Sequence, residues 1–227
     1  MARPLRNVSG VVLAGGTGRR LGASKAYLTL GAQTFLELAV EKLGALCAEV
    51  LVVGNCVTPQ AKLGARFLRE AEDAPPHPAR GLRAALRHAR YSTCLVLAVD
   101  LPLVRQELLA GLLSEGEAEG SPLVLPAVNG FLEPLVGLYR RDLLPRLEAL
   151  ESGQGLQAWA RSLPPGELKL IPEAKLRRWD PELVSFLNVN TWADYRRLTA
   201  CARPSRAAAV PVVPRFSEKR TGCVLRG

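Results

Sequence analysis

A glycine-rich stretch between Val11 and Lys25 constrains this chain more than any other part of it. An apolar run ends there and is followed by three glycines and three cations, Gly15, Gly16, Gly18, Arg19, Arg20 and Lys25. Because glycines lack side chains, the backbone N–H groups of such a loop can approach an anion closely, and the cations add positive charge at the same place. The order predicts a buried strand that leads into a phosphate-binding loop.

The loop matches neither of two common glycine motifs of nucleotide-binding proteins. A Walker loop needs a lysine directly after its last glycine, but Gly22 is followed by Ala23, and Lys25 comes too late. A dinucleotide fingerprint that starts at Gly16 would need a third glycine where Leu21 stands. We therefore expect a nucleotide site of a different type.

The rest of the chain alternates predicted strands and helices, which is typical of an α/β protein. Short apolar runs predict the strands, while helical spacing and capping residues predict the helices. We expect strands at 50–53, 66–69, 93–99, 123–125, 135–139 and 186–190, and helices at 35–47, 81–90, 142–150, 156–162 and after 191. These elements predict a three-layer α/β/α Rossmann-like fold with a mostly parallel central sheet.

The length of 227 residues suits one α/β domain with a substantial core better than two domains. We expect a single domain over residues 1–202, with a nucleotide-binding half at about 1–110 and an acceptor-binding half at about 111–202. Residues 203–227 contain prolines, an alanine run and six Lys and Arg against one Glu. This composition predicts a flexible basic tail.

Charge and composition argue against several classes of protein. The formal net charge is +9, but much of it lies in the tail, so we expect polyanionic ligands and consider nucleic-acid binding unlikely. The five cysteines have no close pairing that would indicate a disulfide framework or a zinc site. Every apolar run is broken before the roughly 18 residues that a membrane span needs. With no cleavable leader before the first strand, we expect a cytoplasmic protein.

Asp100 directly follows the clearest buried strand, at 93–99. Ligands of open α/β sheets collect at the carboxyl ends of the strands, so Asp100 and the Gly15 loop are expected to share one crevice. Mg²⁺ needs only one or two protein carboxylates when phosphates and water complete its shell, which makes Asp100 the candidate metal ligand. Lys25 and Arg19 would offset the negative charge that builds up during phosphoryl transfer.

The acceptor could supply its own nucleophile, because a phosphate monoester carries nearly two charges at pH 7, its second pKa being about 6. The chain has only His77 and His88, and neither lies next to an obvious Ser or Cys nucleophile, which argues against a hydrolase triad. Alternative roles stay open for five residues. Asp100 could cap the next helix or turn, Lys25 could be a solvated lysine, and Asp73, Asn188 and Asn190 could form turns.

Residues 13–22 with Lys25 resemble the pattern Leu-Ala-Gly-Gly-x-x-x-Arg-Met-Gly-x-x-Lys of molybdenum cofactor guanylyltransferases. Later segments resemble that family's motifs in the right order. They are Val53-Gly54-Asn55, Asp73, Val99-Asp100-Leu101-Pro102, Glu133-Pro134-Leu135 and Asn188-Val189-Asn190-Thr191. The resemblance covers about residues 8–198.

The resemblance implies a nucleotide-diphosphosugar transferase-like fold and a nucleotidyltransferase that uses Mg²⁺. Such an enzyme joins GMP from GTP to the terminal phosphate of molybdenum-molybdopterin and releases pyrophosphate. The nucleotide-binding residues that it implies are Leu13, Ala14, Gly15, Gly16, Lys25, Asn55, Asp73 and Asp100, the last also on the metal. Asn188 and Asn190 would bind the acceptor. Transient contact with molybdoenzymes or cofactor-insertion chaperones is expected.

Two departures from the family pattern stand out. Leu21 replaces a methionine, and Arg80 lies in His77–Gly81 where the family has Gly-Pro-Leu-Ala-Gly, a change that bears on the choice between guanine and cytosine. One alternative is therefore a related cytidylyltransferase or sugar-phosphate nucleotidyltransferase, although those loops usually read Ala-Gly where this chain has Gly15-Gly16. A second alternative is a non-catalytic molybdopterin carrier, against which Lys25 and Asp100 argue.

Overall fold

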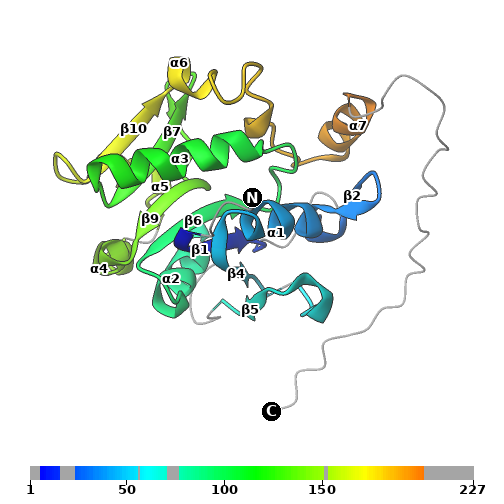
Figure 1. Ribbon diagram of the computed structural model, residues 1–227, viewed down its shortest axis with the longest axis horizontal. Coiled ribbons are helices and arrows are strands. Elements are labelled where there is room, and N and C mark those ends of the chain that lie inside the picture. The colour runs from blue at the N-terminus through cyan, green and yellow to red at the C-terminus, as the bar shows by residue number, and fades with distance from the viewer. Residues whose placement is uncertain (1–5, 16–23, 56, 71–76, 151–152, 202–227) are drawn as a thin grey trace, which may run out of the picture.

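The computed structural model describes residues 6–15, 24–55, 57–70, 77–150 and 153–201 (Figure 1). The strands are β1 (Arg6–Leu13), β2 (Thr29–Leu30), β3 (Gln33–Thr34), β4 (Cys47–Val53), β5 (Arg66–Leu68), β6 (Thr93–Ala98), β7 (Leu123–Val128), β8 (Phe131–Leu132), β9 (Val136–Arg140) and β10 (Leu168–Pro172). The α-helices are α1 (Phe35–Gly44), α2 (Pro78–His88), α3 (Gln106–Glu119), α4 (Leu144–Glu148), α5 (Leu156–Arg161), α6 (Glu173–Leu176) and α7 (Trp192–Cys201). Short 3-10 helices are η1 (Lys25–Tyr27), η2 (Ala61–Leu63), η3 (Arg141–Leu143) and η4 (Val184–Phe186).

The central sheet has the strand order β10-β7-β9-β6-β1-β4-β5, with β8 paired to the end of β7. The pairs β10–β7, β6–β1, β1–β4 and β4–β5 are parallel. Strand β9 is antiparallel to both of its neighbours, β6 and β7. The antiparallel insertion reverses the chain direction twice, so the carboxyl ends of β6 and β7 lie at the same edge of the sheet.

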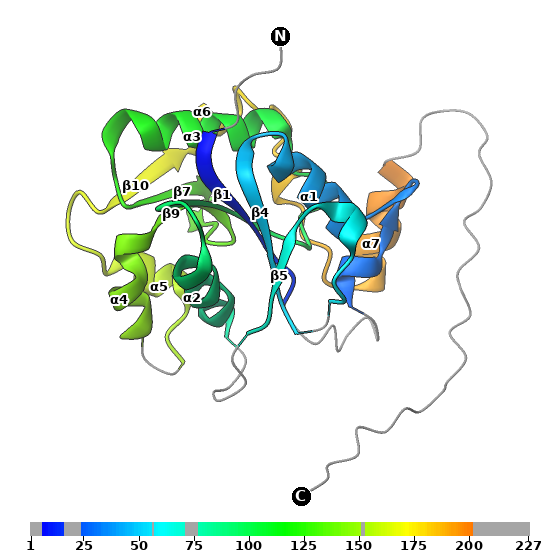
Figure 2. The ribbon, with the colours of Figure 1, turned by 60° about the horizontal axis from the view of Figure 1, so that its bottom comes forward.

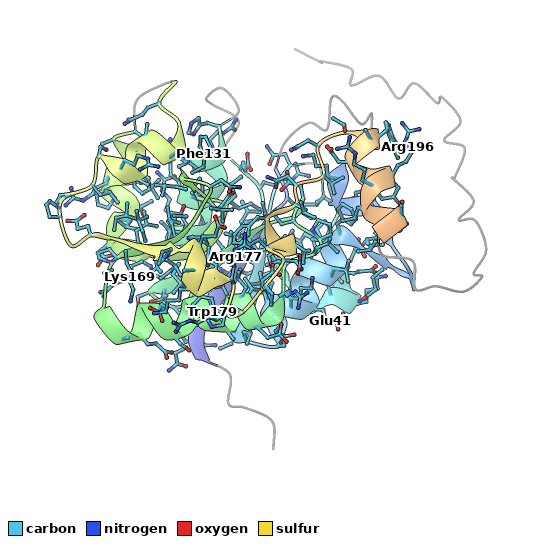
Figure 3. The ribbon with its side chains drawn as sticks, turned by 90° about the horizontal axis from the view of Figure 1, so that it is seen from above. Glu41, Phe131, Lys169, Arg177, Trp179 and Arg196 are labelled. Atoms are coloured by element: carbon cyan, nitrogen blue, oxygen red, sulfur yellow. The ribbon has the colours of Figure 1, made fainter. Side chains whose placement is uncertain are left out.

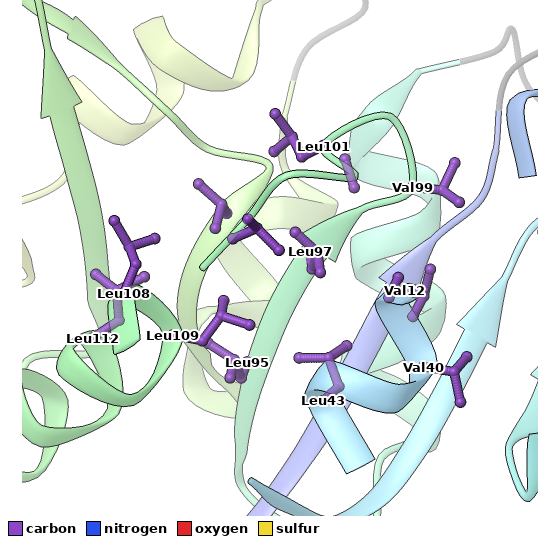
Figure 4. Packing of buried hydrophobic residues seen from close by; sticks show 14 of the residues in the cluster. Val12, Val40, Leu43, Leu95, Leu97, Val99, Leu101, Leu108, Leu109 and Leu112 are labelled. Atoms are coloured by element: carbon purple, nitrogen blue, oxygen red, sulfur yellow. The ribbon is translucent and has the colours of Figure 1, made fainter. Parts of the chain in front are cut away.

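Helices cover both faces of the sheet and bury two hydrophobic clusters (Figure 2). One cluster packs α1, α3, α6 and α7 against the sheet, and the other packs α2, α4 and α5 against the opposite face. In Figure 4, Leu109 of α3 and Leu43 of α1 lie on either side of Leu95 of β6. The predicted three-layer α/β/α fold with a mostly parallel sheet is confirmed.

Helix α2 begins three residues earlier than predicted, at Pro78. Proline suits the first position of a helix because its N–H is not needed there and its φ angle is already helical. His77 caps the helix by accepting a hydrogen bond at Nδ1 from Ala79 N, at 3.1 Å. With Nδ1 as the acceptor, Nε2 is the atom that donates to Gln154 O at 3.1 Å, so the imidazole ties the start of α2 to the segment before α5.

The strand predicted at 186–190 is wrong. The chain forms η4 there, and residues 187–190 have no regular secondary structure. Buried Asp180 accepts a hydrogen bond from Ser185 N at 2.7 Å and pairs with Arg105 Nε at 3.1 Å, while Ser185 Oγ accepts from Arg105 N at 2.9 Å. Side-chain anchors therefore hold this segment in place of a strand ladder.

Helix α3, together with β10 and α6, was not predicted from the sequence. The leucines Leu108, Leu109 and Leu112 have helical spacing and are fully buried, so the pattern was present. Gly111 weakened it, because glycine has a low helix propensity. Packing explains why a glycine stands there, since a Cβ at Gly111 would lie 2.3 Å from the ring of Trp179.

In the part of the chain that the structure describes, no helix is both long and apolar enough to cross a membrane.

Candidate active site

Backbone hydrogen bonds continue past the ends of four neighbouring strands and bring four loops to one edge of the sheet. Ala14 N donates to Val53 O at 2.8 Å, Val99 N to Leu13 O at 3.0 Å, and Gly54 N to Leu68 O at 3.0 Å. Parallel strands of a sheet end at a common edge, where ligands of open α/β folds bind. The loops after β1, β4, β5 and β6 therefore present their polar residues to one region.

Lys25 joins two residues that lie far from it in the sequence. Its Nζ donates to Asp100 Oδ2 at 2.8 Å and to Asn190 Oδ1 at 2.6 Å. The side chains of Lys25 and Asp100 are only 19% and 20% exposed, so water screens this ion pair less than it screens a surface pair. The structure thus brings together one predicted cation, one predicted metal ligand and one predicted acceptor residue.

Asp100 keeps one carboxylate oxygen available. Its Oδ1 is buried and has no hydrogen-bond partner among the described residues. Those residues also include no group of three or more His, Cys, Asp or Glu side chains that could hold a metal ion by themselves. A single carboxylate with an unpartnered oxygen fits a divalent cation of the Mg²⁺ type, whose remaining ligands are phosphate oxygens and water.

The loop that carries Asn190 is fixed by the start of α7. Asp194 Oδ2 accepts hydrogen bonds from Asn190 N at 3.0 Å and from Thr191 N at 2.8 Å, and Asp194 N donates to Thr191 Oγ1 at 3.1 Å. These hydrogen bonds hold the pKa of Asp194 below its usual value, the bond from Asn190 N contributing most. On the other side of the loop, Val189 N donates to Asp100 O at 3.0 Å. The loop is therefore anchored at both ends beside Asp100.

Asn188 is placed differently from Asn190. Its side chain is exposed and makes no hydrogen bond among the described residues, so the structure does not bring it to Lys25 or Asp100. Leu13 and Ala14 are buried and reach the site through their backbone, whereas Gly15 is exposed. The predicted residues Gly16, Arg19 and Asp73 lie outside the described residues.

Glu70 belongs to this edge and was missed by the sequence analysis. Its backbone N–H donates to Asn55 Oδ1 at 2.8 Å. Its carboxylate lies against the glycine loop, since a Cβ on Gly15 would be 2.3 Å from Glu70 Oε1 and a Cβ on Gly81 would be 3.2 Å from it. The signal that could have found Glu70 is its position two residues after the end of β5, by the same reasoning that singled out Asp100.

The ionisation of Glu70 is set by two opposing effects. Burial raises the pKa of the Glu70 carboxyl above its usual value, and the nearby positive charge of Arg80 partly opposes that rise. Arg80 is the residue that departs from the family pattern at the start of α2. Its charge thus favours the acceptor form of Glu70 beside the glycine loop.

Gly54 is required where the ends of β1 and β4 meet. A Cβ at this position would lie 2.7 Å from both C and O of Ala14 and 3.0 Å from Gly15 N. These are backbone atoms of the glycine loop, which a rotamer change cannot move. The absence of a side chain at Gly54 therefore sets how closely the loop approaches Asn55.

Comparisons with known proteins agree on one family. The family model for the MobA-like NTP transferase domain matches residues 10–167. A Mycobacterium avium protein named "Probable molybdenum cofactor guanylyltransferase" is 36% identical over 199 residues, which cover 84% of this chain and 94% of that protein. A protein of the same name from Pelotomaculum thermopropionicum is 30% identical over 209 residues, 90% of this chain and 98% of that protein. Among solved structures, molybdopterin-guanine dinucleotide biosynthesis protein A from Archaeoglobus fulgidus superposes with a TM-score of 0.69 at 28% identity, covering 86% of this chain and 98% of that one.

Proposed function

The chain belongs to the family of MobA-like NTP transferases, and on this basis we propose that it transfers GMP from GTP to the terminal phosphate of molybdenum-molybdopterin. The observation that carries the proposal is the contact of Lys25 with Asp100 and Asn190 at the carboxyl edge, with Asp100 Oδ1 left for a cation. The names of the relatives support guanylyl transfer over the cytidylyl, sugar-phosphate and carrier alternatives.

The proposed reaction needs no general base. An oxygen of the acceptor phosphate attacks the α-phosphorus of GTP, a new P–O bond forms, and the bond from the α-phosphorus to the oxygen that bridges to the β-phosphate breaks. Pyrophosphate leaves with that oxygen and its electron pair. The attacking phosphate is already largely ionised at pH 7, so the chain's task is to position two polyanions and offset their charge.

Each residue of the site has a proposed part in that task. Lys25 places a positive charge next to the transferred phosphate, and Asn190 holds the Lys25 ammonium toward Asp100. Asp100 would hold Mg²⁺, which when bound neutralises charge on the phosphates. Arg19, outside the described residues, is proposed as a second cation.

The nucleotide is proposed to lie along the loops after β1, β4 and β5. Leu13, Ala14, Gly15 and Gly16 would contact it through the backbone, and Asn55 and Asp73 through their side chains. We add Glu70, because guanine carries N1–H and N2–H donors on one edge and a carboxylate offers two acceptor oxygens. Asn188 is proposed to act on the acceptor side. Four expectations remain predictions from the sequence. They are the two halves at about 1–110 and 111–202, the tail at 203–227, the cytoplasmic location, and the contact with molybdoenzymes or cofactor-insertion chaperones.

Pyrophosphate release tests the function directly. The purified chain is mixed with molybdenum-molybdopterin, Mg²⁺ and one of GTP, CTP or UTP. We expect release with GTP and its near loss in Asp100→Asn and Lys25→Ala. Asp142→Asn and Lys62→Ala remove an exposed carboxylate and an exposed cation elsewhere, so both controls should keep full activity. Equal rates with CTP, or full activity in Asp100→Asn, would contradict the proposal.

A further inference from the structure

A rigid hairpin at the carboxyl edge of the sheet holds a large apolar side chain in solvent. The β7–β8 hairpin turns at Asn129 and Gly130, whose φ angles of 50° and 79° suit a two-residue hairpin turn. Asn129 N donates to Glu173 Oε2 at 3.1 Å, and Arg161 donates to Gly130 O at 2.9 Å. Helices α6 and α5 thus clamp the turn from the two faces of the sheet, yet Phe131 is 63% exposed.

The hairpin lies on one side of Asp100, and the nucleotide loops lie on the other. Because β9 is antiparallel to both β6 and β7, the carboxyl end of β7 is at the same edge as Asp100. Two strand spacings separate β7 from β6, which amounts to about 10 Å. The strand order places β1, β4 and β5, with Gly15 and Asn55, beyond β6 in the opposite direction. The β7 side is therefore the side of Asp100 that faces away from the nucleotide loops.

Phe131 stands out among the exposed apolar side chains. Among the described residues, five large hydrophobic side chains are exposed, and Phe131 is the most exposed of them. Leu187, 54% exposed, lies two residues before Val189, whose N–H donates to Asp100 O at 3.0 Å. In Figure 3, Phe131 lies toward the upper side of the view, whereas Lys169 and Trp179 lie below it. The acceptor side therefore offers apolar contact as well as charge.

We infer that Phe131 is the platform on which the flat ring system of the acceptor stacks. This inference rests on the proposed function, since the acceptor there is a pterin that carries a phosphate monoester. A ring stacked on an aromatic side chain buries apolar area without requiring a hydrogen-bond pattern, and the clamped turn removes the need to order Phe131 on binding. Phe131 would position the acceptor, while Asp100 and Lys25 act on its phosphate.

Binding measurements with two small probes test the platform without the reaction. One probe is a pterin bearing a phosphate monoester, and the other is ribose 5-phosphate, which has the phosphate but no aromatic ring. Aromatic truncation at stacking sites typically weakens binding about tenfold or more. We expect Phe131→Ala to bind the pterin phosphate about tenfold more weakly and ribose 5-phosphate unchanged. Phe131→Trp should bind the pterin near the wild-type level and show quenching of its added tryptophan fluorescence.

Leu170→Ala is the matched control, because Leu170 is also an exposed large apolar residue, 42% exposed, on β10. In turnover assays Phe131→Ala should raise KM for the acceptor with kcat and the GTP-induced thermal shift unchanged. Three results would overturn the inference: Phe131→Ala binds the probes as Leu170→Ala does, Phe131→Ala binds both probes equally more weakly, or Phe131→Ala loses the GTP-induced thermal shift. Failure of the proposed function would look different, since the wild-type chain itself would then release no pyrophosphate from GTP.

Discussion

Replacing Gly54 by alanine is expected to destabilise the protein and weaken GTP binding together. The new Cβ would lie 2.7 Å from backbone atoms of Ala14, so the ends of β1 and β4 must move apart. Forcing extra atoms into a packed site costs about 1–3 kcal/mol. For a folded domain of this size, each kcal/mol corresponds to a shift in Tm of roughly 2–4 °C. We therefore expect Gly54→Ala to melt about 2–12 °C below the wild type.

Gly44→Ala provides the control with the opposite sign. Gly44 ends α1 and is exposed, and a Cβ there would find its nearest neighbour, Val50 Cγ2, at a comfortable 3.9 Å. Alanine in place of a helical glycine stabilises by up to about 1 kcal/mol, so Tm should stay the same or rise slightly. Thermal melts with and without GTP and Mg²⁺ measure both effects, because a ligand that binds the native state raises Tm. A Gly54→Ala variant with wild-type Tm and a full GTP shift would refute the packing argument.

Two further substitutions probe the loops around the site. Glu70→Gln should lower GTP affinity without lowering stability, because burial, which raises the pKa of Glu70, disfavours the charged form that glutamine removes. In the wild type, GTP affinity should fall as the pH drops through the raised pKa of Glu70, and titration calorimetry at a series of pH values would show this. An equal loss of affinity for CTP would assign Glu70 to the ribose instead. Asp194→Ala should lower the free energy of unfolding, because the backbone N–H groups of Asn190 and Thr191 lose their acceptor, and should raise KM for the acceptor as Asn190 loosens. An unchanged KM for the acceptor would show that the position of Asn190 does not depend on Asp194.

The meeting of Lys25 and Asp100 could be predicted because both follow features that the sequence displays clearly. A buried strand ending in a carboxylate and a glycine loop ending in a cation must face the same edge of a parallel sheet. The partnership of Lys25 with Asn190 could not be predicted. Asp194 signals the start of a helix, but the path of the loop before it depends on the side-chain anchor at Asp180, which carries no periodic signal.

Glu70 and α3 were missed for different physical reasons. Glu70 follows a strand of only three residues, so the end of that strand was a weaker pointer to the site than the end of β6. In α3, glycines lower the helix propensity where the packing of Trp179 and Leu138 needs space at Gly111 and Gly116. Tertiary contacts override local preference at these positions, and only the structure reveals those contacts.

The contact between Lys25 and Asn190 spans 165 residues of sequence. Such long-range closure forms late in folding, because a large loop of chain must be ordered before the contact stabilises it. A chain still being synthesised, or one cut before residue 190, would hold its glycine loop and Asp100 but lack the last member of the cluster. Binding of the acceptor would therefore be delayed until α7 has docked, whereas the loops proposed for the nucleotide are complete much earlier in the chain.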